Sequence, residues 1–192
     1  MPKVMSMQQF KSEHGYDSVF ESPLGRLGVQ CRDNRVTRLD YLASTFPLKV
    51  ATTAFERQVL KQIAQFFVNS KHHFTLPLDM QGTDFQGRVW HALTGIPAGQ
   101  TLAYGELAAR LGSGARAVGN ACRNNPVSII VPCHRVVSAA GIGGYSGSTG
   151  GTEIQRKQWL LGHEGIVGSA LKTRQKAPYT GLHTRKQRNL HA

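Results

Sequence analysis

The sequence predicts an α/β fold with an N-terminal lobe of antiparallel strands plus a helix and a mostly helical C-terminal lobe. Three observations lead to this prediction: strand-like segments up to residue 42, three capping-box patterns, and a glycine-rich turn between two short helical segments. The C-terminal lobe should therefore hold a helix-turn-helix, with short strands around Cys133. The expected division is 1–80, 81–168, and a basic, poorly ordered tail over 169–192.

The N-terminal lobe is expected to begin with strands between residues 17 and 42. A Pro-Leu-Gly turn interrupts them, and the segment RVTRLDYL alternates apolar and polar residues imperfectly. Thr53 and Glu56 then form a capping-box pattern, in which the threonine accepts from a backbone N–H and the glutamate returns a hydrogen bond. Apolar residues follow at nearly helical spacing, so an amphipathic helix is predicted over 54–68.

Helices dominate the expected C-terminal lobe. A second capping box at Thr83 opens a helix that ends at Gly95. The short helices 104–111 and 115–124 follow, joined by a Gly-Ser-Gly turn, which is the pattern of a helix-turn-helix. A third box, at Thr152, predicts the start of the last helix.

Asn125 and Pro126 end the second short helix, because proline lacks an N–H and restricts the residue before it. The apolar run that follows predicts short strands at 128–137. This turn connects the basic helix directly to the Cys133-His134 pair.

The charge balance points to a polyanionic partner. The 192 residues carry 23 Lys plus Arg against 11 Asp plus Glu, a formal net charge of +12, so nucleic acid is the first partner to consider. Six cations between Lys172 and Arg188 supply half of that excess, and such tails often serve only solubility.

The remaining composition indicates a protein of the cytoplasm, or of the nucleus in a eukaryote. No segment approaches the roughly 18 apolar residues of a membrane span, and MPKVMSMQQF lacks the apolar core of a secretion signal. Cys31, Cys122 and Cys133 fit free thiols, and Cys31 and Cys122 are expected to be structural. No CxxC pair or recurring histidine spacing occurs, so neither a metal nor a cofactor is expected.

The helix ARAVGNACRNN combines little bulk with long cations. Ala115, Ala117 and Gly119 would let its backbone approach a nucleic-acid groove closely, and Arg116 and Arg123 would meet phosphates or bases. The alternative is a tightly packed helix pair whose arginines meet only water.

Cys133 and His134 are a candidate nucleophile and base. A thiol with an ordinary pKa of about 8.5 is mostly protonated at neutral pH and needs such a base. Neighbours in a regular strand point to opposite faces, so the backbone must turn here, and Pro132 favours that. Glu164 is the candidate third group that would fix the histidine, and His163 competes as the base. The alternative is that Cys133 is simply a buried apolar residue.

The run from Thr83 to Gly165 resembles the O6-alkylguanine-DNA alkyltransferases, which remove alkyl groups from guanine in DNA. The matching segments are, in order, FQGRVWHAL, IPAGQTLAYGELAARLG, ARAVGNACRNNPVSIIVPCHRVV, GGYSG and KQWLLGHEG. They cover nearly half the chain, and the SPLG turn of the N-terminal lobe extends the match weakly.

The resemblance implies a role for Cys133 as the acceptor of the alkyl group, with His134 and Glu164 completing a relay through water. Asn125 would fix the turn beside the site. Tyr104 would help rotate the nucleotide out of the duplex and donate a proton to the guanine ring.

The resemblance also implies the residues that bind the substrate and the DNA. Backbone carbonyls of Cys133 and Val136 would read the guanine amino group, the Ser146 amide would face O6, and Tyr145 would contact the base. Arg116 would fill the gap in the base stack. The residues expected at the DNA surface, in the minor groove, are Ala115, Arg116, Ala117, Gly119 and Arg123.

The expected partner is double-stranded DNA that contains O6-alkylguanine, with O4-alkylthymine and the size of the alkyl group left open. The thioether product is inert, so one chain should act once. A monomer is expected, with assembly on DNA left open. Two departures from the family are a longer stretch over Ser148–Thr152, beside the pocket, and an N-terminal lobe with only Cys31, which predicts no zinc.

Three alternatives remain at this point. A non-catalytic alkyltransferase-like protein would bind damaged DNA, but such relatives typically lack the nucleophile. A transcription regulator would read base edges in the major groove, for which ARAVGNAC is too poor in suitable side chains. A hydrolytic cysteine enzyme would turn over and would not need the basic helix.

Overall fold

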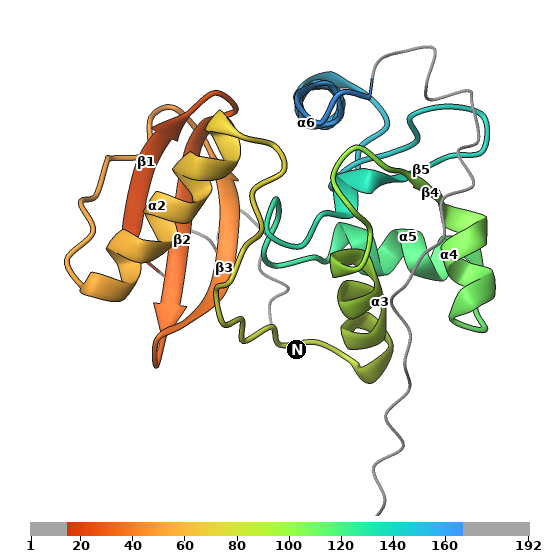
Figure 1. Ribbon diagram of the computed structural model, residues 1–192, viewed down its shortest axis with the longest axis horizontal. Coiled ribbons are helices and arrows are strands. Elements are labelled where there is room, and N and C mark those ends of the chain that lie inside the picture. The colour runs from red at the N-terminus through yellow and green to blue at the C-terminus, as the bar shows by residue number, and fades with distance from the viewer. Residues whose placement is uncertain (1–14, 167–192) are drawn as a thin grey trace, which may run out of the picture.

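The computed structural model describes residues 15–166, and the basic tail predicted over 169–192 lies outside them. The mixed architecture confirms the predicted α/β class (Figure 1). The strands are β1 (Ser18–Ser22), β2 (Gly25–Arg32), β3 (Arg35–Leu42), β4 (Leu102–Ala103) and β5 (Val136–Val137). The helices are α2 (Ala54–Val68), α3 (Asp84–Thr94), α4 (Tyr104–Arg110), α5 (Ala115–Arg123) and α6 (Gly151–His163).

The N-terminal part is an antiparallel sheet in the order β1-β2-β3, with α2 packed across one face (Figure 1). The register pairs Val19 with Gly28 and Val29 with Leu39, so the sheet buries one apolar face. A bulge between Gln30 and Cys31 shifts the pairing of β2 with β3 and explains the imperfect alternation of the sequence there.

Two of the three predicted capping patterns start helices. Thr53 accepts from the Glu56 amide at 3.1 Å and begins α2. Thr83 and Gln86 form a reciprocal box at the start of α3. The third prediction is wrong, because α6 begins at Gly151 with no side-chain cap.

The prediction of strands over 128–137 is also largely wrong. Only Val136–Val137 forms a strand, which pairs in parallel with β4. Ile129 adopts a φ of 73°, and Cys133–Arg135 forms a single 3-10 turn after Pro132. This turn is the departure from regular strand geometry that the Cys133-His134 pair requires.

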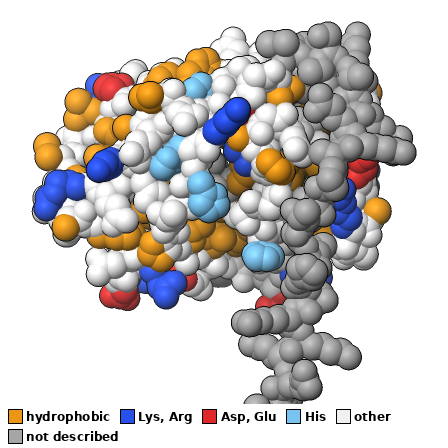
Figure 2. Space-filling view, in the orientation of Figure 1, with side chains coloured by type: hydrophobic (Ala, Val, Ile, Leu, Met, Phe, Trp, Pro, Cys, Tyr) orange, Lys and Arg blue, Asp and Glu red, His pale blue; other side chains and the backbone are white. Residues whose placement is uncertain are grey.

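One continuous apolar core joins the N-terminal sheet to the helices, from Leu27 and Val29 through Val89 and Trp90 to Leu160. The Leu39 amide of β3 donates to the Pro126 carbonyl at 2.9 Å, so the sheet contacts the segment that leads to Cys133. Among residues 15–166, no helix is both long and apolar enough to cross a membrane. On the face drawn in Figure 2, basic side chains are scattered and form no single patch among the described residues.

Candidate active site and DNA interface

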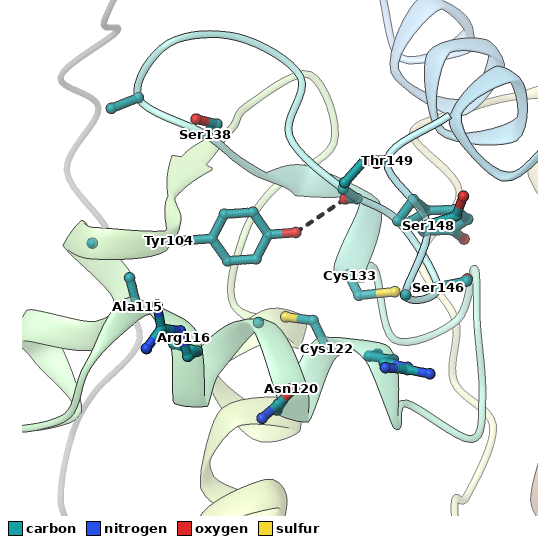
Figure 3. A pocket seen from close by; sticks show the side chains of 17 residues that line it. Tyr104, Ala115, Arg116, Asn120, Cys122, Cys133, Ser138, Ser146, Ser148 and Thr149 are labelled. Carbon is teal, nitrogen blue, oxygen red and sulfur yellow. Dashed lines mark hydrogen bonds between the residues drawn. The ribbon is translucent and has the colours of Figure 1, made fainter. Parts of the chain in front are cut away.

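A pocket of about 710 Å³ opens between α4, α5 and the segment before α6, and Cys133 forms part of its wall. Figure 3 shows Tyr104, Cys122 and Ser146 around Cys133. We call this cavity the Cys133 pocket. The predicted site residues that line it are Tyr104, Ala115, Arg116, Gly119, Arg123, Cys133, Tyr145 and Ser146.

The turn that carries Cys133 is fixed by Asn125. Its side-chain amide donates to the Val131 carbonyl at 2.8 Å and to the Cys133 sulfur at 3.2 Å. Its side-chain oxygen accepts from the Val127 amide at 3.1 Å. Asn125 therefore satisfies the backbone where α5 has ended and also supplies one hydrogen bond to the thiol.

His134 is fully buried beside Cys133, and its partner is Glu164 at the C-terminal end of α6. The His134 Nε2 lies 2.9 Å from the Glu164 carboxylate, which fixes the proton on Nε2. The other ring nitrogen, Nδ1, is buried and makes no hydrogen bond within residues 15–166. The structure therefore leaves Nδ1 free to accept the proton of a neighbouring thiol.

Arg135 holds Glu164 in place. The Arg135 guanidinium donates to both carboxylate oxygens, at 2.8 and 3.1 Å, and also donates to the Ile96 carbonyl. Burial alone would raise the pKa of Glu164, but His134 and Arg135 outweigh it and hold that pKa at about 2. The carboxylate is therefore ionised across the physiological range.

Burial dominates the electrostatics of the thiol and the imidazole. It raises the pKa of Cys133, which the Asn125 amide, the Lys157 ammonium and the Tyr145 hydroxyl partly oppose. Burial also lowers the pKa of His134, although Glu164 acts in the opposite direction. A neutral thiol and a neutral imidazole thus occupy neighbouring positions of the turn, which are the protonation states that general-base catalysis requires.

A two-residue hairpin forms one wall of the pocket. Tyr145 and Ser148 exchange two backbone hydrogen bonds of 2.9 Å, and Ser146 and Gly147 between them have φ values of 48° and 83°. A Cβ at Gly147 would lie 2.4 Å from the Arg123 Nε, so the arginine packs directly against the glycine. The Tyr145–Ser148 hairpin is therefore held against the end of α5.

Lys157 of α6 is a functional candidate that the sequence analysis missed. It is fully buried, and its ammonium donates to the Val136 carbonyl at 2.6 Å and the Gly144 carbonyl at 2.9 Å. Burial lowers the pKa of Lys157 to about 8. The available signal was its helical spacing with Leu160 and Leu161, which places a lysine on the apolar face of the last helix.

The Gly144 carbonyl also accepts from the Tyr104 hydroxyl at 3.1 Å (Figure 3). Tyr104 and Lys157 thus meet at one carbonyl on the pocket wall. The Lys157 ammonium lies 5.6 Å from the centre of the Tyr104 ring, which further fixes the tyrosine.

The α5 helix exposes the face that the sequence predicts for DNA. Ala115, Arg116, Ala117 and Arg123 are exposed, whereas Val118, Ala121 and Cys122 pack inward. The Trp90 indole donates to the Ala121 carbonyl at 2.9 Å and fixes the inner side of the helix.

The other candidates are placed as follows. Val136 and Ala117 do not line the pocket, and the Val136 carbonyl already accepts from Lys157. His163 Nε2 donates to the Phe66 carbonyl at 2.7 Å and the ring stacks on Trp159, so His163 is not the partner of Cys133. Cys122 is buried as expected, yet it lines the pocket.

No group of three or more His, Cys, Asp or Glu able to hold a metal ion occurs between residues 15 and 166. Cys31, the cysteine on which a zinc site in the N-terminal lobe would depend, is half-buried with a free thiol.

Comparison with known proteins matches residues 84–166 to the family described as 6-O-methylguanine DNA methyltransferase, DNA binding domain. A methylated-DNA–protein-cysteine methyltransferase of Mycolicibacterium paratuberculosis is 40% identical over 151 residues, which cover 75% of this chain and 88% of the relative. The constitutive enzyme of that name from Bacillus subtilis is 36% identical over 162 residues, which cover 79% of this chain and 96% of the relative.

Solved structures give the same result. The O6-methylguanine methyltransferase of Mycobacterium tuberculosis superposes with a TM-score of 0.65 at 39% identity, covering 76% of this chain and 90% of its own. An OGT of the same organism in complex with DNA superposes with a TM-score of 0.64 at 36% identity, covering 81% and 96%. These matches confirm the resemblance seen in the sequence, and the chain belongs to the methylated-DNA–protein-cysteine methyltransferase family.

Proposed function

We propose that the protein repairs O6-alkylguanine in double-stranded DNA by transferring the alkyl group irreversibly to Cys133. The observation that supports this most is the arrangement at the pocket. A buried thiol there adjoins a histidine whose Nε2 is held by an ionised glutamate and whose Nδ1 is free. The relatives are named methylated-DNA–protein-cysteine methyltransferases, which is consistent with transfer of a methyl group from DNA to a cysteine.

The transfer begins with the proton of the Cys133 thiol, which passes to His134 Nδ1 directly or through water. Glu164 stabilises the resulting imidazolium because its carboxylate is already ionised. The thiolate attacks the alkyl carbon, the new C–S bond forms, and the C–O6 bond breaks with its electron pair moving to the guanine. Tyr104 supplies a proton to the guanine ring and regains one through solvent as His134 releases the proton taken from the thiol, so a normal guanine leaves and both side chains end neutral.

The target atom is inaccessible inside a duplex, so the nucleotide must rotate out, at a cost of a few kcal/mol. The small residues of α5 support close approach to the minor groove, and the exposed Arg116 at the pocket supports insertion into the gap. Small side chains make few contacts that distinguish one DNA base pair from another. This suits a protein that repairs lesions in any sequence context.

In this proposal the segment 1–80 is an N-terminal lobe and 81–168 is the DNA-binding and alkyl-transfer domain. The Ser146 amide faces O6, and Tyr145 contacts the base from the hairpin. The substrate is chromosomal DNA, so we place the protein in the cytoplasm, or in the nucleus if the organism is eukaryotic. The thioether product has no resolving partner, and therefore each chain reacts once.

The test is incubation with a duplex that contains one O6-methylguanine, followed by intact and peptide mass spectrometry. We expect one methyl group per chain, on the peptide that contains Cys133, and none in a Cys133→Ser variant. A Cys122→Ser variant is the matched control, because that thiol lines the same pocket, and it should still accept one methyl group. Tight binding without any mass change would instead indicate a damage-binding protein and would overturn the proposal.

A further inference from the structure

Asn120 of α5 takes no part in the transfer chemistry, yet it lies on the helix face proposed for DNA. It follows Arg116 by four residues and precedes Arg123 by three, so the three side chains form one line along the helix. All three are exposed, and all three line the Cys133 pocket. Asn120 therefore lies between two cations, beside the small residue Gly119, where a nucleic-acid groove would approach closely.

The Asn120 side chain is free to bind a partner. The Asn124 side-chain amide donates at 2.8 Å to the Asn120 backbone carbonyl, and the Asn120 side chain itself makes no hydrogen bond within residues 15–166. It points away from the Cys133 thiol, so it faces outward rather than toward the base that enters the pocket (Figure 3). Asn120 thus offers an acceptor oxygen and two N–H donors at the proposed DNA surface.

The minor groove presents few groups that could bind this amide. A·T and T·A pairs show only acceptors there, whereas a G·C pair adds the N2 amino group of guanine as a donor. A side-chain amide that uses an N–H and its oxygen together therefore finds both partners only at a G·C pair. The guanidinium groups of Arg116 and Arg123 donate but cannot accept, so Asn120 alone in this line can accept from the amino group.

The position of Asn120 on α5 also limits which base pair it can reach. Four residues of α-helix rise about 6 Å, and successive base pairs are stacked about 3.4 Å apart. In the proposed complex Arg116 fills the gap that the rotated nucleotide leaves, with α5 lying along the groove. Asn120 therefore meets a base pair no more than two steps from the lesion.

We propose that Asn120 binds the minor-groove edge of this neighbouring base pair and gives repair of O6-alkylguanine a preference for G·C there. This inference rests on the proposed function, because it requires a duplex whose damaged base has rotated into the Cys133 pocket. The small residues of α5 still allow repair of lesions in other contexts, at a lower rate.

The experiment measures the second-order rate of methyl transfer to Cys133 from duplexes that contain one O6-methylguanine. At each position up to two steps on either side of the lesion, the pair is in turn G·C, inosine·C, A·T or 2,6-diaminopurine·T. Inosine lacks the N2 amino group of guanine, and 2,6-diaminopurine adds that group to adenine. Each duplex is measured with wild type and with Asn120→Ala, because the ratio of the two rates cancels the cost of opening that duplex.

At one of these positions we expect wild type to be about fivefold faster than Asn120→Ala with G·C, the effect of one hydrogen bond, and less than about twofold faster with inosine·C or A·T. The pair 2,6-diaminopurine·T should restore the larger ratio. Alanine favours an exposed helical position, so the variant should fold. Asn124→Ala is the matched control, because this exposed asparagine bonds within its own helix and does not line the pocket, and it should keep the wild-type preference.

Equal ratios on all the duplexes, or ratios that do not follow the amino group, would overturn the inference. So would an equally large loss in Asn120→Ala with free O6-benzylguanine, because Asn120 would then act on the pocket and not on the duplex. If the wild type transfers no methyl group to Cys133 from any duplex, the proposed function fails instead, so the two failures are distinguishable.

Discussion

Replacing Glu164 by glutamine tests the central ion pair of the site. The substitution keeps an oxygen that can accept from His134 Nε2 but removes the charge that binds both His134 and Arg135. It therefore separates the carboxylate's hydrogen-bonding geometry from its charge. We expect Glu164→Gln to lose both stability and reactivity.

The magnitude follows from the pKa of Glu164, which lies at about 2 against an ordinary value of 4.5. This difference corresponds to about 3 kcal/mol of unfolding free energy at neutral pH. Because the folded pKa is the lower one, the contribution is fully present above the unfolded pKa and is lost as pH falls toward 2. At pH 3 only about 1.5 kcal/mol should remain.

The assay is urea unfolding of wild type and variant at pH 7 and pH 3, followed by tryptophan fluorescence. The difference in unfolding free energy should fall by roughly half between the two pH values. Glu153→Gln is the matched control, because it removes a partly exposed ion pair on the same helix and should cost under about 1 kcal/mol. An equal loss from Glu164→Gln at both pH values would refute the reasoning. The variant should also transfer alkyl groups at least about tenfold more slowly, since the imidazolium loses its counter-charge.

Three further predictions concern the turn, the helix and the hairpin. Arg116→Ala should slow repair of duplex DNA far more than reaction with free O6-benzylguanine, and equal slowing of both would contradict a role in flipping. Asn125→Ala removes three hydrogen bonds and should lower the unfolding free energy by about 2 to 3 kcal/mol in urea titrations, with slower transfer from both substrates. Gly147→Ala should lower the thermal midpoint by the equivalent of about 1 to 3 kcal/mol, because its Cβ would meet Arg123 at a φ of 83°. A Cβ added at Gly87, inside α3, would meet open space. Gly87→Ala should therefore raise the thermal midpoint by the equivalent of up to about 1 kcal/mol of unfolding free energy, and it serves as the contrasting control.

The start of a helix could be predicted from the sequence where a side chain caps the helix N-terminus. Thr53 and Thr83 each have a partner three residues later, and both caps form. At Thr152 the same pattern fails because Gly150 and Gly151 precede it. Gly151 adopts a φ of 65°, a backbone conformation that glycine populates readily. The helix therefore begins one residue before the threonine.

The segment 128–137 shows the limit of apolar patterning. Ile129, Ile130 and Val131 are buried as a strand prediction requires, yet the backbone there forms turns. A short apolar run buried on all sides does not specify its own secondary structure. The Asn125 side chain stabilises the turn instead of a strand, because it hydrogen-bonds both the Val127 amide and the Val131 carbonyl. No spacing in the sequence predicts these two hydrogen bonds.

Residues of the site that carry no motif could not be found from the sequence. Cys133 and His134 are adjacent in the sequence, so their roles as nucleophile and base could be predicted from it. The role of Glu164 could be predicted from the family resemblance. Arg135 and Tyr41 contact the site through partners that lie 29 and 104 residues away in the chain, respectively. Such pairings depend on how the sheet and the last helix meet, which no local spacing encodes.

Ser148 and Thr149, the first two residues of the longer stretch over Ser148–Thr152, line the pocket, and the remaining three do not. Tyr145 and Ser148 already exchange both backbone hydrogen bonds, so the additional residues follow a completed turn and lead out to exposed glycines before α6. The hairpin is held independently of that stretch: Tyr41 contacts Tyr145, Arg123 packs on Gly147, and Gly144 just before it is bound by Tyr104 and Lys157. Four contacts from outside the loop therefore define this wall, and we expect the size of the accepted alkyl group to depend on those contacts rather than on the length of the stretch.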